Sequence, residues 1–416
     1  MADLPHKNKD YFQYIQKLFQ SIPNNIKDLN QIFFDNKCPF FDLISKEEIS
    51  KEFLKYYNNL KNLVFELETL FPEKELSLLK TCQKKVKKVL TRKQVALLFL
   101  LSFFNLIKIN EKNNCNYFVV SNVLYYSKVS FLFEFGKCFL NYLTQIGKWL
   151  SEGNKILDEE IIYVRDNIEN LDYNDKELCE LNLNEKDSLF EGDASYCVDF
   201  ANKYIGGGVL RGGSVQEEIL FTIEPEAMVS MLFMEVMHTN DAIGIYNTIQ
   251  YSKYKGYKNK FEFQGNAITN DTQIKKHKII AIDAFPMKKL SNPNDNYNQV
   301  IIMRDIHKAY VGFNLINYEN KDEPKTIATG NWGCGAFGGN HELKFIQQWI
   351  AASYAGVKRL AYYTFGNKKM LGAVEHYKEI KAKFKKAHNL YDSLVFNQLD
   401  DNKIIESLLN LPNNNQ

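Results

Sequence analysis

Short apolar runs separated by helix-like segments constrain the fold of this chain more than any other feature of its sequence. Runs rich in β-branched and aromatic residues recur from about residue 115. Between some of them lie segments such as "HELKFIQQWIAASYAG", whose apolar residues recur at three- and four-residue steps. Strands alternating with helices predict an α/β or α+β domain with a partly parallel sheet. The expected strands are "NYFVVSNVLYY" (116–126), "AIGIYNTI" (242–249), "HKIIAIDAF" (277–285) and "RLAYYTF" (359–365).

The first part of the chain has a different pattern, because its apolar residues follow the period of a helix. "YFQYIQKLFQSI" (11–22) and "ISKEFLKYYNNLKNLVFELETLF" (49–71) both show this spacing. We therefore expect a helical accessory domain over residues 1–115 and an α/β domain over residues 116–416.

The longest apolar run, "VALLFLLSFFNLI" (95–107), is shorter than the roughly 20 residues needed to span a bilayer. Thr91 and Gln94 precede it with the spacing of a capping box, in which each side chain hydrogen-bonds the other residue's backbone. The run is therefore predicted to be a buried core helix. The N-terminus lacks the basic-then-apolar layout of a signal peptide.

Charge and cysteine content narrow the class of protein. The net charge of +2 is far below the basic bias of a chain that grips a nucleic-acid backbone, so no direct DNA binding is expected. Seven widely spaced cysteines without a CxxC indicate reduced thiols, as in a nuclear or cytoplasmic protein. The histidines show neither H-x-x-x-H nor H-E-x-x-H spacing, so no metal site is predicted.

The segment "VDFANKYIGGGVLRGGSVQEEI" concentrates backbone freedom just before two carboxylates. Five of the eight residues 206–213 are glycines, and Glu217 and Glu218 follow. Glycine lets the main chain approach a ligand closely, and successive N–H groups can line an anion-binding concavity. The alternative, a flexible surface loop with a solvated pair of glutamates, stays open from this pattern alone. Adjacent side chains diverge by about 100° on a helix, which favours two different roles over a symmetric pair.

A second glycine-rich segment, "ATGNWGCGAFGGNHELKF", contains a literal G-x-G-x-x-G at Gly333, Gly335 and Gly338. It follows an expected strand, "KTIAT", and precedes a helix pattern, which is the context for a diphosphate at a helix N-terminus. The next expected strand ends without the acid that binds a ribose in dinucleotide dehydrogenases, so that class is disfavoured. "YSKYKGYKNKFEF" (251–263) interleaves aromatics with lysines; base stacking and a plain strand-and-turn are both compatible with it.

These same residues carry a resemblance to the poly(ADP-ribose) glycohydrolases, whose signature is Gly-Gly-Gly followed after a short spacer by Gln-Glu-Glu. Here the signature is 206–208 and 216–218, and "VDFAN", "QYSKYKGY", "IDAF", "KAYVGF", "ATGNWGCGAFGG" and "YYTFG" match in family order. "LTRKQVALLFLLSFFNL" is similar to the family's helical accessory region. The resemblance covers roughly residues 85–370. It implies a macrodomain-like mixed β-sheet flanked by helices, with a helical domain ahead of it.

The resemblance also implies an activity: release of ADP-ribose from poly(ADP-ribose), mainly from chain ends, by hydrolysis of the ribose–ribose O-glycosidic bond. Glu218 takes the place of the family's catalytic acid/base, while Glu217, Asn202 and Asp199 fall where the family positions the ribose, beside Gln216. The remaining implied substrate contacts are Gly207 and Gly208 in the first loop, Tyr254 and Tyr257, then Asn331, Gly335, Ala336 and Phe337 at the diphosphate, Phe365 near the adenosine, and Glu191 as the adenine acid.

The chemistry of acetal cleavage agrees with one acid/base glutamate, since the departing oxygen must be protonated and an oxocarbenium-like centre stabilised. No cofactor or metal is required. The expected partners are poly(ADP-ribose), poly(ADP-ribosyl)ated proteins and ADP-ribose, with no membrane binding, and the expected state is a monomer in the nucleus or cytoplasm. The alternative is a non-catalytic macrodomain that only binds ADP-ribose; the pair Glu217 and Glu218 argues against it.

Overall fold

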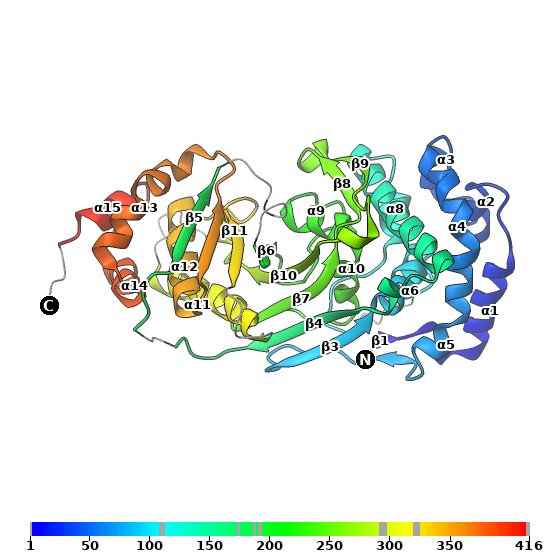
Figure 1. Ribbon diagram of the computed structural model, residues 1–416, viewed down its shortest axis with the longest axis horizontal. Helices are drawn as coiled ribbons and strands as arrows, with labels where there is room; N and C mark the ends of the chain where they lie inside the picture. The colour runs from blue at the N-terminus through cyan, green and yellow to red at the C-terminus, as the bar shows by residue number, and fades with distance from the viewer. Residues whose placement is uncertain are drawn as a thin grey trace.

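An eight-stranded mixed sheet occupies the middle of the molecule in this computed structural model (Figure 1). The model describes residues 2–107, 113–172, 175–185, 189, 194–290, 298–318 and 325–412. Across the sheet the strands are β3 (Val86–Thr91), β4 (Glu160–Asn167), β7 (Asp241–Ile249), β10 (Lys276–Asp283), β6 (Tyr196–Ala201), β11 (Thr326–Gly330), β12 (Arg359–Tyr363) and β5 (Glu180–Asn184). From β10 to β5 all neighbours are parallel, whereas β3, β4 and β7 extend the sheet in antiparallel pairing. The predicted α/β architecture is confirmed.

Both faces of the sheet are covered, and the strand sequences show why. In β10, Ile279 and Ala281 belong to one apolar core, whereas Ile280 and Ile282 belong to the other. Side chains alternate between the faces of a strand, so a run with apolar residues at every position must be buried on both sides. Two hydrophobic cores therefore sandwich the sheet.

The helices divide between these two cores. One core takes in the N-terminal helices together with α9 (Gln216–Ile223) and α10 (Pro225–Met228). The other takes in α11 (Gln299–Asn314), α12 (His341–Tyr354), α13 (Leu371–Phe384), α14 (Ala387–Phe396) and α15 (Ile404–Asn410). In Figure 1 the C-terminal helices, orange to red, lie at the opposite end of the molecule from the blue N-terminal helices.

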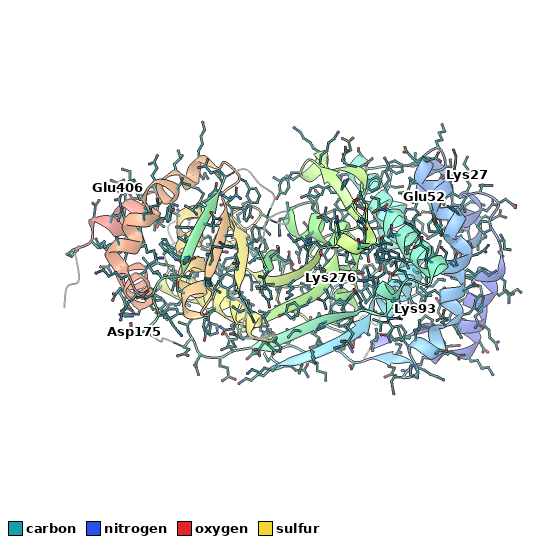
Figure 2. The ribbon with its side chains drawn as sticks, in the orientation of Figure 1. Lys27, Glu52, Lys93, Asp175, Lys276 and Glu406 are labelled. Carbon is teal, nitrogen blue, oxygen red and sulfur yellow. The ribbon has the colours of Figure 1, made fainter. Side chains whose placement is uncertain are left out.

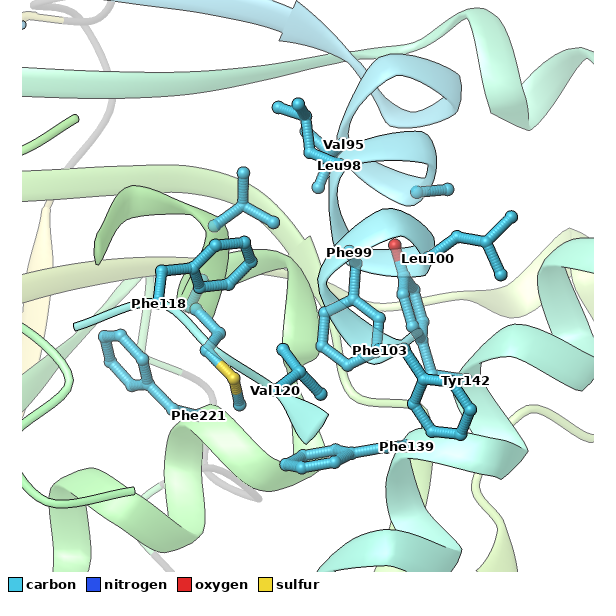
Figure 3. Close-up of a cluster of buried hydrophobic side chains, with 14 of the residues drawn as sticks. Val95, Leu98, Phe99, Leu100, Phe103, Phe118, Val120, Phe139, Tyr142 and Phe221 are labelled. Atoms are coloured by element: carbon cyan, nitrogen blue, oxygen red, sulfur yellow. The ribbon is translucent and has the colours of Figure 1, made fainter. Parts of the chain in front are cut away.

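The N-terminal helical layer packs around one strongly apolar helix, α6 (Arg92–Phe103). Its other members are α1 (Lys9–Gln20), α2 (Asp28–Phe34), α3 (Pro39–Ile44), α4 (Glu48–Phe65), α5 (Leu67–Leu70), α7 (Ser121–Tyr125) and α8 (Ser130–Glu152). Phe99 of α6 contacts Phe139 and Tyr142 of α8 edge-on, with ring centroids 5.5 and 5.0 Å away (Figure 3). Phe221 of α9 lies in the same cluster, so the helical layer anchors the helix that carries the two glutamates.

Several sequence expectations about this layer are confirmed. The run at 95–107 begins as the predicted buried helix, and Thr91 and Gln94 form both hydrogen bonds of the capping box. Within the described residues, no helix combines the length and the apolar character that a bilayer crossing requires. Charged side chains of both signs are spread over the two ends of the molecule, as Lys27, Glu52 and Glu406 illustrate (Figure 2).

One expected strand is wrong. "NYFVVSNVLYY" contains no strand and instead ends in the short helix α7. Its apolar side chains, Phe118 and Val120 among them, are buried in the helical core and not on the sheet, which overrides the local β propensity. Conversely, 86–91 was expected within the helical part and forms the edge strand β3. The division of the chain at residue 115 stays a prediction. The strands expected at 242–249, 277–285, 325–329 and 359–365 and the helix at 341–356 are confirmed.

Candidate active site

The predicted site residues gather at one edge of the sheet. Because β10, β6, β11 and β12 are parallel, their carboxyl ends meet at the same edge, where α/β proteins bind ligands. Asp199 is near the end of β6 and Asn202 follows it, Asn331 follows β11, and Phe365 follows β12. Segments far apart in the sequence thus supply one site.

Two buried glutamates occupy the first turn of α9, at its second and third residues. Glu217 accepts hydrogen bonds from the backbone N–H of Gly206 (2.7 Å) and of Asn202 (2.8 Å). Glu218 accepts from the N–H of Gly208 (2.9 Å) and, across the helix start, from the N–H of Val215 (2.9 Å). Four backbone donors and the positive end of the helix therefore hold both carboxyl groups in fixed positions.

The two carboxyl groups converge, although their Cα–Cβ bonds diverge as expected for adjacent helical residues. A Cβ placed on Gly207 would lie 2.4 Å from Oε2 of Glu217 and 2.6 Å from Oε1 of Glu218. The residue also has a left-handed backbone, with φ of +50°. Glycine is required here because the loop passes in contact with both carboxyl groups.

Gln216 fixes the start of α9 to the sheet. Its Oε1 accepts from the N–H of Phe200 (2.8 Å), and its Nε2 donates to the carbonyl of Val198 (3.2 Å). Both partners belong to β6, so the side chain replaces a neighbouring strand at this point. The position of the two glutamates relative to β6 is thereby set.

Asp199 adds a third carboxyl group to the site. It lies on the same face of β6 as Cys197 and Ala201, which belong to the core on the α9 side. The side chain is fully buried, and neither of its oxygens has a hydrogen-bond partner in the part of the chain that the structure describes. Burial and the charge of Glu218 raise its pKa well above the usual range.

The pKa of Glu217 also lies well above its usual range. Burial is the main cause, followed by the charges of Asp199 and Glu218, against the opposing hydrogen bonds from Asn202 and Gly206. Asp199 and Glu217 therefore keep their protons to a higher pH than exposed carboxyl groups do.

In the first glycine loop, the N–H groups of the first three glycines donate to acceptors within the protein. Gly206 and Gly208 donate to the glutamates, and Gly207 donates to the carbonyl of Tyr204 (3.0 Å). The backbone N–H groups that the glycine content suggested for a ligand thus bind the protein's own carboxyl groups. Direct contact of Gly207 and Gly208 with a substrate stays a prediction.

The second glycine loop, 331–339, has the opposite character. Two hydrogen bonds fix the loop: the ring N–H of Trp332 donates to the carbonyl of Ile282 (2.9 Å), and Nδ2 of Asn331 donates to the carbonyl of Thr364 (3.1 Å). Among the described residues, the N–H groups of Gly335, Ala336 and Phe337 have no acceptor, and a Cβ on Gly335 would meet nothing within 4 Å. Consecutive N–H groups that face open space suit an anionic ligand.

Two half-exposed aromatic rings border the site, Tyr257 and Phe365, each with 51% of its surface accessible. Phe365 has φ of +53°, an uncommon backbone for a bulky residue, and its Cε2 lies 3.1 Å from a Cβ placed on Gly330. The pKa of Tyr257 is raised by burial and by the charge of Glu218, which places this ring beside the acids.

The third predicted aromatic, Tyr254, is held within the hairpin of β8 (Ser252–Lys255) and β9 (Glu262–Asn266). Its ring stacks on Phe261 with centroids 5.4 Å apart. Glu191, the predicted adenine acid, lies outside the described residues. Asn116, whose amide hydrogen-bonds the first glycine loop, was not among the predicted site residues. No motif surrounds it in the sequence, so no local pattern could have indicated its role. Within the described ranges, no group of three or more His, Cys, Asp or Glu side chains is placed to hold a metal ion.

A mixed sheet between helices, with a carboxyl cluster and an open glycine loop at the ends of its parallel strands, defines a macrodomain-like α/β protein. A family model described as poly(ADP-ribose) glycohydrolase, macro domain fold, matches residues 168–371. The predicted resemblance to the poly(ADP-ribose) glycohydrolase family is confirmed over these residues.

Named relatives extend this finding. The chain is 29% identical over 278 residues to probable poly(ADP-ribose) glycohydrolase 2 of Arabidopsis thaliana, covering 55% of this chain and 52% of that protein. It is 40% identical over 194 residues to poly(ADP-ribose) glycohydrolase 1 of Caenorhabditis elegans, covering 43% and 24%. The poly(ADP-ribose) glycohydrolase of Deinococcus radiodurans, solved with ADP-ribose, aligns over 49% of this chain and 85% of that one, at 11% identity and a TM-score of 0.36. The chain thus spans about half the length of the first of these relatives.

Proposed function

We propose that this protein hydrolyses the ribose–ribose O-glycosidic bonds of poly(ADP-ribose) and releases ADP-ribose. The observation that carries the proposal is the buried cluster of Asp199, Glu217 and Glu218, in which the first glycine loop hydrogen-bonds both glutamates. The second glycine loop lies at the same edge of the sheet, and three of its N–H groups have no acceptor among the described residues. The family relationship supports the substrate class. A site of this kind combines a proton donor with a place for a diphosphate.

Glu218 is the acid/base in this mechanism. A proton passes from its carboxyl group to the departing 2′-oxygen, which takes the bonding electrons as the C–O bond breaks and an oxocarbenium-like centre forms. Water then adds to that carbon, and Glu218 removes the proton that the water loses. Glu218 is preferred over Glu217 because it is the carboxylate whose charge reaches Tyr257 at the half-exposed rim.

Glu217 and Asp199 support this chemistry in two ways. Glu217 is locked between the N–H groups of Gly206 and Asn202, which suits a group that binds ribose hydroxyls in place. Asp199 has two oxygens without donors, so a substrate hydroxyl is the partner that it lacks. The raised pKa values of both groups favour their neutral forms, whereas Glu218 recovers its own proton from the attacking water.

The diphosphate of the substrate lies on the second glycine loop in this proposal, against the N–H groups of Gly335, Ala336 and Phe337. Backbone N–H groups bind such an anion without a strong positive charge, in keeping with the net charge of +2. Tyr257 and Phe365 then flank the adenosine and the terminal ribose. A terminal unit held in this manner makes cleavage mainly exo-type, with ADP-ribose as the product.

The decisive experiment incubates the protein with labelled poly(ADP-ribose) and separates free ADP-ribose from oligomers. We expect ADP-ribose from the earliest times, without a transient ladder of oligomers. Glu218→Gln should lower the rate at least about a thousandfold, the scale of losing a general acid/base, with ADP-ribose affinity within about threefold of the parent. The comparison variant Glu217→Gln should weaken ADP-ribose binding as well as turnover.

Other outcomes of the same assay separate the alternatives. Intact polymer that binds tightly to the parent protein would make the chain a reader of ADP-ribose. Wild-type turnover in Glu218→Gln would remove Glu218 from the acid/base role. An early ladder of oligomers would replace exo-type cleavage by internal cleavage.

A further inference from the structure

One side chain outside the acid cluster contacts the first glycine loop at several points. Asn116 is buried, with 5% of its surface accessible, and lies in the segment between α6 and α7. Its Nδ2 donates to the carbonyls of Ile205 (2.8 Å), Gly207 (2.9 Å) and, more weakly, Tyr204 (3.3 Å). An amide nitrogen has two N–H groups, so the two short contacts use its full donor capacity.

The two short contacts fall on the two peptide units that hold the glutamates. The carbonyl of Ile205 and the N–H of Gly206 belong to one peptide plane, and that N–H donates to Glu217. The carbonyl of Gly207 and the N–H of Gly208 belong to another, and that N–H donates to Glu218. Asn116 therefore reaches each carboxyl group through a single planar amide.

A planar amide transmits both orientation and polarisation. Because the C=O and N–H of one unit point in opposite directions, a donor that fixes the carbonyl also fixes the direction of the N–H. A hydrogen bond accepted by the carbonyl polarises the unit and strengthens its N–H as a donor, by about 10–30% per bond. Loss of the Asn116 amide would loosen and weaken the grip on both carboxyl groups at once.

We propose that Asn116 is a positioning residue for Glu217 and Glu218, and that it acts through the 205–206 and 207–208 peptide units. This inference rests on the proposed function for its effect on turnover. It also gives the segment between α6 and α7 a part in holding the two carboxyl groups.

The surroundings of Asn116 keep its amide in this orientation. Its Oδ1 accepts from the N–H of Tyr117 (2.8 Å) and from Nη2 of Arg211 (3.0 Å), which leaves Nδ2 for the carbonyls. The segment is pinned to its neighbour by the N–H of Val236 donating to the carbonyl of Asn114 (2.8 Å). Asp199 from β6 is the charged group that faces Glu217 and Glu218, and Tyr257 is the titratable group on the side of the hairpin, whereas Arg211 contacts Oδ1 of Asn116.

Asn116→Ala is the direct test, with Asn114→Ala as its matched control. Asn114 is an exposed asparagine two residues away, and its side chain accepts only from the Tyr204 hydroxyl (3.1 Å) among the described residues, not from the glycine-loop backbone. We expect Asn116→Ala to lower kcat about 10- to 100-fold with KM within about threefold, as for a small displacement of catalytic groups. Asn114→Ala should leave both unchanged, and Asn116→Gln, which keeps an amide, should recover part of kcat.

The role of Asn116 can also be measured in the free protein, by an experiment that does not depend on the proposed function. In protein labelled with ¹⁵N-glycine, Asn116→Ala should move the amide protons of Gly206 and Gly208 upfield, because their hydrogen bonds weaken, while that of Gly265 stays in place. If the parent protein released no ADP-ribose, the proposed function would fail and this measurement would still decide the role of Asn116. Unchanged resonances at Gly206 and Gly208 would overturn it.

A purely structural role predicts a different result. It would lower the thermal midpoint while the folded fraction kept its kcat, or it would change kcat and KM together; either result would overturn the proposal. If Asn116→Ala fails to fold, Arg211→Met releases Oδ1 and frees the amide to rotate. A fall in kcat of about threefold at constant KM then supports the relay, and parent-like kcat with unmoved Gly206 and Gly208 resonances opposes it.

Discussion

The two glycine loops look alike in sequence and differ in what their backbones do. In the first, the N–H groups of Gly206 and Gly208 are consumed by Glu217 and Glu218. In the second, those of Gly335, Ala336 and Phe337 have no acceptor among the described residues. In the first loop, glycine lets the backbone come close to the protein's own acids. In the second loop, it leaves the backbone accessible to a ligand. Glycine content therefore marks a site without telling which partner the backbone serves.

The buried acids next to the two loops differ in their charge partners and in the direction of their pKa shifts. Burial alone would raise the pKa of Asp305, below the second loop, but Lys344 and Arg304 outweigh it and hold the pKa below its usual range. Asp199, near the first loop, pairs with no cation among the described residues, and burial together with the charge of Glu218 raises its pKa. The second loop rests on a satisfied ion-pair cluster, which makes it a rigid platform. The first loop lies beside Asp199, whose oxygens have no hydrogen-bond donor among the described residues and can accept from a substrate.

The largest difference expected between the two loops comes from adding one methyl group to each. Gly207→Ala would place a Cβ against both carboxyl groups, whereas Gly335→Ala meets nothing within 4 Å and has no positive φ. We expect kcat for ADP-ribose release to fall about 100-fold in Gly207→Ala, because both carboxyl groups must move. Gly335→Ala should stay within about threefold of the parent.

Gly212→Ala separates displacement of the acids from backbone strain. Gly212 has φ of +89° and open space around its Cβ position, so the substitution adds strain alone. It should cost stability of roughly 1–2 kcal/mol in thermal unfolding with kcat nearly unchanged. If its kcat falls as far as that of Gly207→Ala, strain and not contact with the carboxyl groups explains the first loop.

Much of this contrast could not be read from the sequence. The strand and helix periods predicted β7, β10, β11, β12 and α12, because burial on both faces imposes a pattern on each segment. The pairing of Asn116 with the peptide units next to Gly206 and Gly208 joins residues about 90 positions apart and leaves no local pattern. The strand predicted at 116–126 failed for a related reason, since its β-branched residues pack on helices. Local signals identify elements, whereas the use of each N–H group depends on tertiary neighbours.

A second, smaller effect concerns stability. The unfolded state loses the Asp199 proton near pH 3.9, whereas the folded state keeps it to a much higher pH, so folding stability falls as pH rises through that window. Asp199→Asn removes this penalty. We expect the variant to unfold with a free energy about 2 kcal/mol above the parent at pH 8, and with no difference below about pH 4. Urea unfolding at both pH values measures this, and a variant less stable than the parent at pH 8 would show that Asp199 is satisfied in the folded protein.

The smallest effect tests the N–H groups of the second loop directly. Replacing Phe337 by phenyllactic acid turns its amide into an ester, which removes the N–H and keeps the ring. If that N–H donates to the diphosphate, ADP-ribose should bind about tenfold more weakly, since a hydrogen bond to a charged group contributes about 1.5 kcal/mol. The matched ester at Leu210 in the first loop, whose N–H likewise has no acceptor among the described residues, should leave the affinity unchanged. Calorimetry on both esters decides the matter: equal losses would mean that the two loops contact the ligand alike, whereas a loss at Phe337 alone assigns anion binding to the second loop.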